Sequence, residues 1–184
     1  GHNASWFQLV SVKNPANAAA NAVVYPYAGV KGTTPSRATP EQLLGLSVSD
    51  TAHVKECIDA AFDLKCEFIV LDGSGALGDH WCELTGAPDL GIIRDTIAYL
   101  RTTGREEMVD LIYFGGARSG TDAAKLIGLG AKVIVYGIPL AIAAGGIIRG
   151  DTVDFAADRT EGETAEAVSN LLKASAGEAS MMAR

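Results

Sequence analysis

The sequence predicts an α/β domain in which parallel strands alternate with helices. Two observations carry this prediction. From residue 43 onward, short apolar runs typical of buried strands alternate with stretches whose apolar residues recur at helical spacing. Glycine-rich turns follow several of these strands, and 21 glycines against six prolines indicate tight loops rather than a linker. In such layered structures, ligand sites lie at the carboxyl ends of the strands.

The first 43 residues are the least regular part of the chain. Residues 6–12 and 23–27 have the composition of short strands, but turns rich in Asn, Pro and Gly interrupt them. We therefore divide the chain into an N-terminal segment (1–43), a series of βα units with phosphate-binding loops (44–150), and a C-terminal helix and tail (151–184).

The central part is a regular series of elements. A short strand over 44–48 ends at Ser49-Asp50, which can cap the helix expected over 51–64. Further strands are expected over 67–71, 109–114 and 133–136, helices after Pro88, from Thr121 and after Gly137, and a last helix over 163–173 with a polar tail. Apolar residues recur at helical spacing after Pro88: Leu90, Ile93, Ile97 and Leu100. The apolar run 133–148 is shorter than the roughly 20 residues of a membrane span, which favours a buried strand, a loop and a helix start.

Charge and cysteine content narrow the classes of function. Fifteen basic against 22 acidic residues give a net charge of −7, which repels a nucleic-acid backbone, so we do not expect nucleic acid as a partner. Because the longest apolar run is too short for a membrane span, we do not expect a membrane as a partner either. Cys57, Cys66 and Cys82 are too few and too irregularly spaced for a disulfide scaffold or a zinc site. We expect free thiols in a cytoplasmic protein, and no metal.

The strongest local signal is a pair of glycine turns after two successive strands. Residues 115–120, Gly-Gly-Ala-Arg-Ser-Gly, follow the strand expected over 109–114, and Gly137-Ile138 follow the next strand. Glycines let the backbone approach a ligand closely, and the helix that follows each turn presents unsatisfied N–H groups. Two such turns in tandem predict a phosphate site between them, to which Arg118 adds a charged contact. The alternative, that the glycines only permit tight turns, is weaker for the pair than for either turn alone.

These residues resemble the last two βα units of FMN-dependent TIM barrels, above all the FMN-binding domain of the glutamate synthase family. The resemblance covers about residues 44–148 and rests on residues 114–125, 129–131 and 136–137, with 68–73 and 87–91 upstream. It implies the C-terminal part of a (β/α)8 barrel and an FMN-dependent oxidoreductase whose flavin transfers electrons toward amino-acid synthesis. The Gly-Gly-x-Arg-Ser/Thr-Gly element is shared with type-two isopentenyl diphosphate isomerases and 2-hydroxy-acid oxidases, so FMN is better supported than the particular reaction.

Site residues and partners follow from this resemblance and from the turns. A small-molecule substrate is expected, and a further chain or domain would complete the barrel. No catalytic residue is assigned. The expected cofactor-binding residues lie at strand ends or in the turns after them: Asp72, Gly115, Gly116, Arg118, Ser119, Gly120, Gly137 and Ile138. For Asp72, ligand contact and a role in the turn are equally open.

Departures from the family pattern keep a second function open. Glutamate synthases carry a flavin-contacting lysine on the strand that corresponds to 44–48, where this chain has none. Their next loop reads His-Asp-Gly-Gly-Thr-Gly, whereas residues 72–78 read Asp-Gly-Ser-Gly-Ala-Leu-Gly, and no cysteine follows Cys82. The alternative is a non-catalytic barrel-like subunit that retains only a phosphate or nucleotide site.

Other residues that could take part in chemistry are expected to have structural or solvated positions instead. His80 as an acid or base, or Cys82 as a nucleophile, has no identifiable partner, so an ordinary loop is favoured. Tyr25 and Tyr27 line a flavin pocket or, as is more common, belong to the core. His53 is expected to be solvated on its helix.

Overall fold

The computed structural model describes residues 9–11, 21–27, 35–75, 82–84, 86–155 and 158–182, and for residues 9–11 and 82 the backbone alone. Within these residues, six strands form one sheet in the order β1-β2-β3-β4-β5-β6, and each neighbouring pair is parallel. The strands are β1 (Leu9–Ser11), β2 (Ala22–Pro26), β3 (Leu43–Val48), β4 (Phe68–Asp72), β5 (Asp110–Phe114) and β6 (Val133–Val135).

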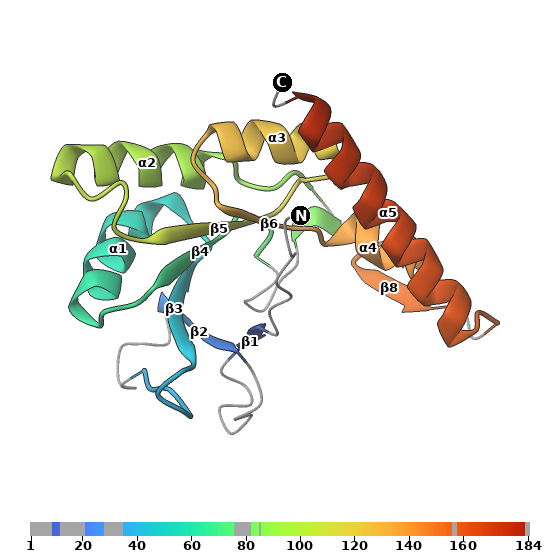
Figure 1. Ribbon diagram of the computed structural model, residues 1–184, viewed down its shortest axis with the longest axis horizontal. Helices are drawn as coiled ribbons and strands as arrows, with labels where there is room; N and C mark the ends of the chain where they lie inside the picture. The colour runs from blue at the N-terminus through green and yellow to red at the C-terminus, as the bar shows by residue number, and fades with distance from the viewer. Residues whose placement is uncertain are drawn as a thin grey trace.

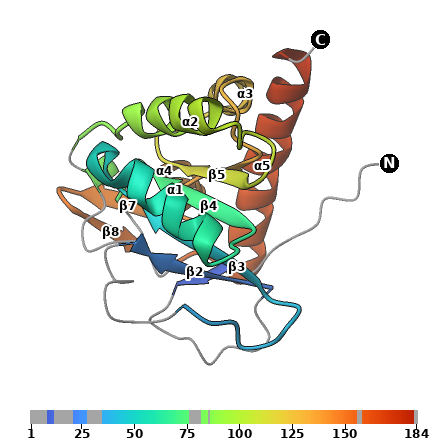
Figure 2. The same ribbon diagram turned by 90° about the vertical axis from the view of Figure 1, so that its left-hand side faces the viewer.

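The helices that accompany these strands are α1 (Val54–Asp63), α2 (Gly91–Thr103), α3 (Gly120–Gly128) and α4 (Ile138–Ala143), with short 3-10 turns η2 (Thr51–His53) and η3 (Cys82–Leu84). Helices α1 to α3 connect strands β3 to β6, and α4 follows β6. Figures 1 and 2 show α1, α2 and α3 along one face of the sheet. Strands that follow each other in sequence order through right-handed crossovers keep their helices on one side, as in a (β/α)8 barrel. The predicted α/β fold and its partial-barrel form are confirmed.

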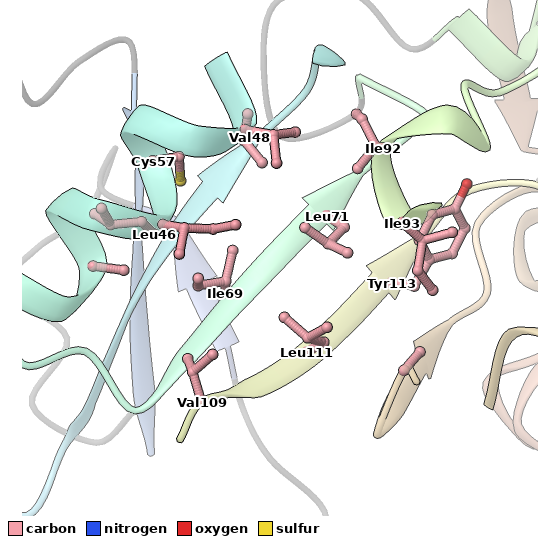
Figure 3. Close-up of a cluster of buried hydrophobic side chains, with 14 of the residues drawn as sticks. Leu46, Val48, Cys57, Ile69, Leu71, Ile92, Ile93, Val109, Leu111 and Tyr113 are labelled. Atoms are coloured by element: carbon pink, nitrogen blue, oxygen red, sulfur yellow. The ribbon is translucent and has the colours of Figure 1, made fainter. Parts of the chain in front are cut away.

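The sheet has a different apolar cluster on each face. Alternate residues of β2 to β5 point toward the helices, where Leu46, Ile69, Leu71, Leu111 and Tyr113 pack with residues of α1 and α2 (Figure 3). The intervening residues Ala22, Val24, Phe68 and Val70 form a second buried cluster on the opposite face. Two-sided burial explains why these strands read as continuous apolar runs.

One glycine in the sheet has a packing role. A Cβ on Gly45 would lie 2.2 Å from Cε2 of Phe68, so the aromatic ring fills the space that a side chain of β3 would occupy. The register pairs the same two residues across β3 and β4. Gly45 therefore permits the large ring at the start of β4.

Two predictions about helices were wrong. The last helix, α5, spans Glu161–Met182 rather than 163–173 with a polar tail. It packs along α3 and α4 (Figure 1), and of its residues Ser175 is buried, so its sequence carries only a weak apolar periodicity. Leu90 does not belong to the buried face of α2: it precedes the first turn and is 56% exposed, whereas Ile93 and Leu100 are fully buried.

The strand, loop and helix start predicted for the apolar run 133–148 are present as β6 and α4, but the strand is not buried and the end of the run differs from the prediction. Val133 is 40% exposed, and the end of the apolar run forms a hairpin of β7 (Gly146–Arg149) and β8 (Thr152–Phe155). Gly150, at φ +62°, makes the turn between these strands, and such a turn signal was missed in the sequence. Among the described residues, no helix is both long and apolar enough to cross a membrane.

Candidate functional site

The predicted site residues meet at the carboxyl edge of the sheet. Asp72 ends β4 and pairs in register with Phe114, the last residue of β5, which in turn pairs with Val135 of β6. The turns that begin at Gly115 and Gly137 therefore leave neighbouring strands at the same edge. The tandem arrangement expected from the sequence is present.

The turn after β5 needs glycine at both of its first positions. Gly115 has φ +130° and Gly116 has φ +72°, conformations that L side chains rarely adopt. A Cβ on Gly115 would lie 2.9 Å from the backbone nitrogen of Ser74, and a Cβ on Gly116 would lie 2.7 Å from Cγ of Pro88. The loop after β4 thus packs directly on the backbone of the glycine turn.

The start of α3 is capped by its own residues. Ser119 is the N-cap, and its Oγ accepts a hydrogen bond from the Asp122 amide. The Asp122 carboxylate accepts in turn from the amide of Arg118 at 3.2 Å, while the Arg118 residue itself is exposed. Directly after β6, the hydroxyl of Tyr136 donates to the Ser119 carbonyl oxygen at 3.1 Å. This last contact ties the two glycine turns together.

Two carboxylates that the sequence analysis missed accept hydrogen bonds from amides of the first turn. Gly116 N–H donates to Oε1 of Glu83, in the loop after β4, at 2.5 Å. Gly120 N–H donates to Oε2 of Glu178, in α5, at 2.9 Å. The turn therefore does attract anionic oxygens, as expected for backbone amides near the start of a helix. The sequence contains no signal for either contact, because the partners are 33 and 58 residues apart.

The second turn leads into α4. Gly137 is the N-cap, Ile138 is the first helical residue, and Pro139 follows in the first turn of the helix. Within the part of the chain that the structure describes, the amides of Gly137 and Ile138 donate no hydrogen bond. Two backbone donors are thus available beside the first turn.

Asp72 and Ser74 form the buried polar part of this edge. Asp72 is 1% exposed, and its Oδ1 accepts a hydrogen bond from Ser74 Oγ at 2.7 Å. The Ser74 amide donates to the carbonyl oxygen of Phe114 at 3.2 Å, which links the loops after β4 and β5. The described contacts of Asp72 give it at least a role in holding the turn, and ligand contact remains a prediction.

The remaining candidates have structural or undescribed positions. Tyr25 is a core residue, 5% exposed, whose hydroxyl donates to the Ser36 carbonyl oxygen. His53 is solvated, and its Nδ1 lies 2.8 Å from the Asp50 carboxylate. His80 and the side chain of Cys82 lie outside the described residues. Tyr27 is half-buried and packs against the core.

Two cysteines are free thiols in unreactive surroundings. Burial, followed by the charges of Cys66 and Asp50, raises the pKa of the Cys57 thiol to about 12. Burial, followed by the charge of Glu67, raises the pKa of the Cys66 thiol to about 11. Neither is an activated nucleophile. Among described residues, no group of three or more His, Cys, Asp or Glu side chains is placed to hold a metal ion.

A cavity of about 220 Å³ lies at the other edge of the sheet, among Val109, Asp110 and Lys132 at the amino ends of β5 and β6. Lys132 is paired there with Asp110. In barrels of this type that edge serves stability rather than chemistry.

The segment that contains the glycine turns is similar to known proteins. The family model described as the conserved region in glutamate synthase matches residues 45–150, which is more than half of the 184 residues and includes both turns. This chain belongs to the glutamate synthase family. Over 93 residues it is 36% identical to a glutamate synthase large subunit-like protein of Rhizobium meliloti (strain 1021). That match covers 47% of this chain and 21% of the relative, so the chain corresponds to a small part of it.

Solved structures show the same barrel fold. A flavocytochrome b2 double mutant with sulfite bound superposes with a TM-score of 0.62 at 13% identity, over 96% of this chain and 49% of that one. A mandelate oxidase with benzoyl-formic acid gives a TM-score of 0.53 at 17% identity, over 91% and 51%. At these identities the likeness concerns the fold alone. The chain spans about half of each structure.

Proposed function

We propose that this member of the glutamate synthase family is part of an FMN-binding oxidoreductase domain, in which the FMN phosphate binds between the turns after β5 and β6. The observation that carries this is the pair of glycine turns at one edge, of which the first already holds carboxylate oxygens on its amides. Backbone N–H groups that already donate hydrogen bonds to one kind of anion can donate to another, so the residues present fit a phosphate group.

This chain would contribute binding and orientation. The amides of Gly116, Gly137 and Ile138 would donate to phosphate oxygens, and the exposed Arg118 would add a charge-assisted contact. Ser119 and Gly120 shape the start of α3, and Gly115 allows the backbone to run against the loop after β4. Asp72, buried at the end of β4, would orient the polar part of the ligand. When bound, FMN supplies the electron-transfer chemistry.

A second function, a non-catalytic subunit that keeps only a phosphate or nucleotide site, is favoured by one observation. β3 carries no lysine. On the sheet face that holds the second buried cluster with Phe68, this strand presents Gly45 and Ser47. Without a cationic side chain on this strand, a bound flavin lacks the contact that glutamate synthases provide there. The finer proposal, electron transfer toward amino-acid synthesis, therefore stands on family membership.

Reconstitution separates these functions. The purified chain would be incubated with FMN, separated from free flavin by gel filtration, and examined by absorbance. We expect stoichiometric flavin that dithionite reduces and an added acceptor reoxidises. Bound flavin that does not turn over with any acceptor would support the non-catalytic subunit. Absence of bound flavin would contradict both the FMN assignment and the phosphate site.

Further partners and the compartment complete the proposal. A (β/α)8 barrel has eight strands, whereas the described sheet has six, with β1 and β6 at its edges. We propose that another segment or chain supplies the missing βα units, and that a small molecule is the substrate. The free thiols Cys57 and Cys66 support a reducing, cytoplasmic environment.

A further inference from the structure

The side chain of Glu83 occupies a backbone donor of the predicted phosphate turn. Its Oε1 accepts from Gly116 N–H at 2.5 Å, and the two residues belong to different loops at the carboxyl edge of the sheet. Glu83 lies in η3, in the loop after β4, and is half-buried. A hydrogen bond from a backbone N–H to a carboxylate is stronger than a hydrogen bond between neutral groups.

The surroundings show that Gly116 is a fixed donor. Its φ of +72° sets the direction of the N–H, and Pro88 packs against the other side of the residue, 2.7 Å from where a Cβ would lie. Pro88 is itself held by its neighbour Asp89, whose amide donates to the Gly73 carbonyl oxygen at 2.9 Å. The backbone is therefore restrained on both loops, and a ligand must meet the Gly116 N–H where the Glu83 carboxylate now accepts from it.

The Glu178 contact is of a different kind. A Cβ on Gly120 would lie 2.0 Å from the backbone oxygen of Ser175 and 2.5 Å from Cβ of Glu178, so this glycine is pressed against α5. Glu178 thus belongs to a helix–helix contact, whereas Glu83 reaches Gly116 from a loop at the edge that would receive the ligand.

We propose that Glu83 is an internal competitor of the phosphate group: its carboxylate occupies the Gly116 amide in the ligand-free protein and leaves when a phosphate binds. This inference rests on the proposed function. One N–H cannot donate fully to two anions, and a carboxylate beside a phosphate dianion is repelled. The competitor lowers the affinity for phosphate ligands and keeps the turn satisfied without them.

The test compares Glu83→Gln with wild type and with Glu106→Gln, which removes the same charge from an exposed pair with Arg101 near the opposite edge. In ligand-free protein labelled with 15N, we expect the Gly116 amide proton to move upfield in Glu83→Gln alone. In a titration followed by flavin fluorescence, the same variant should bind FMN about tenfold more tightly, and Glu106→Gln should match wild type.

Each result decides the inference. An unchanged Gly116 resonance in Glu83→Gln would show that the Glu83 carboxylate does not accept a hydrogen bond from this amide. A shifted resonance with unchanged or weaker FMN binding would show that Glu83 does not compete. If neither the wild-type protein nor Glu83→Gln binds FMN, the proposed function fails, and inorganic phosphate becomes the probe. A larger phosphate-dependent shift of Gly116 in the variant than in wild type then supports competition, and equal or absent shifts overturn it.

Discussion

The amide of Gly120, in the first turn of α3, donates a hydrogen bond to the Glu178 carboxylate of α5 at 2.9 Å. The same glycine leaves no room for a side chain, because the Ser175 backbone oxygen lies 2.0 Å from the position of a Cβ. α5 therefore rests directly on the start of the helix that follows the glycine turn (Figure 1). Polar and steric evidence at one residue makes α5 an integral part of this edge.

Gly120→Ala should destabilise the fold. The added methyl group must push α5 away from α3, and overpacking of this kind costs about 2–3 kcal/mol. Gly128→Ala, in the same helix, has nothing within 4 Å of its Cβ position and should be neutral or stabilising by about 0.5 kcal/mol. Urea unfolding followed by circular dichroism measures both. Equal midpoints for the two variants would contradict the close packing of α5.

Removal of the Glu178 carboxylate tests the polar half of the same contact. Glu178→Ala leaves the Gly120 amide without this acceptor, and we expect a loss of about 1 kcal/mol in the free energy of unfolding. Glu166, exposed on the same helix, provides the control: Glu166→Ala should change stability by less than about 0.5 kcal/mol. A Glu178→Ala protein as stable as the Glu166→Ala control would show that the hydrogen bond contributes nothing.

Local patterns predicted most elements of the sheet and its helices. Asp50 follows β3 by two residues and, as expected of a capping residue, accepts a hydrogen bond from the His53 amide at the start of η2. Continuous apolar runs marked β4 and β5, because both of their faces are covered. The segment before residue 43 carried weaker signals, yet β1 and β2 lie within or overlap the two short runs noted there and extend the same parallel sheet.

The parts that the sequence did not predict depend on contacts between distant residues. α5 packs along α3 and α4, and its own weakly apolar face indicates neither these contacts nor its end at Met182. Glu83 and Glu178 were missed for the same reason. In the sequence each reads as an ordinary surface glutamate, and only the folded chain brings its carboxylate to a glycine amide far away in the sequence. By contrast, the tight turn at Gly115 and Gly116 was predicted from the glycine pair itself, and the positive φ at both positions is the reason that glycine is needed there.

The cysteines give a prediction about reactivity. Because its pKa is raised to about 11, Cys66 carries about one thiolate per thousand molecules at pH 8, against about a quarter for an ordinary thiol. Cys57, with a pKa of about 12, should react more slowly still. We expect both to resist iodoacetamide in the native protein and to react after denaturation, as measured by peptide mass spectrometry. Rapid native labelling of Cys57 would contradict its burial in the core.

Gly116 offers the sharpest test of the ligand site. Gly116→Ala must place a side chain at φ +72° against Pro88, so the turn shifts and its N–H is no longer aimed as before. Gly104→Ala is matched, because Gly104 ends α2 at φ +66° with nothing within 4 Å of its Cβ position. Both variants should lose about 1 kcal/mol of stability from the left-handed conformation, with a further cost at Gly116 from Pro88.

The two glycine variants should differ far more in ligand binding. We expect Gly116→Ala to weaken FMN binding at least tenfold, Gly116→Val to weaken it by a few kcal/mol, and Gly104→Ala to bind as wild type does. Arg118→Ala should have a smaller effect than either Gly116 variant, because water replaces an exposed guanidinium more readily than a backbone donor. Flavin fluorescence titration gives the affinities, and circular dichroism verifies the fold. A folded Gly116→Ala protein with wild-type affinity would remove the turn after β5 from the phosphate site, since a re-aimed N–H cannot keep the same bond to a phosphate oxygen.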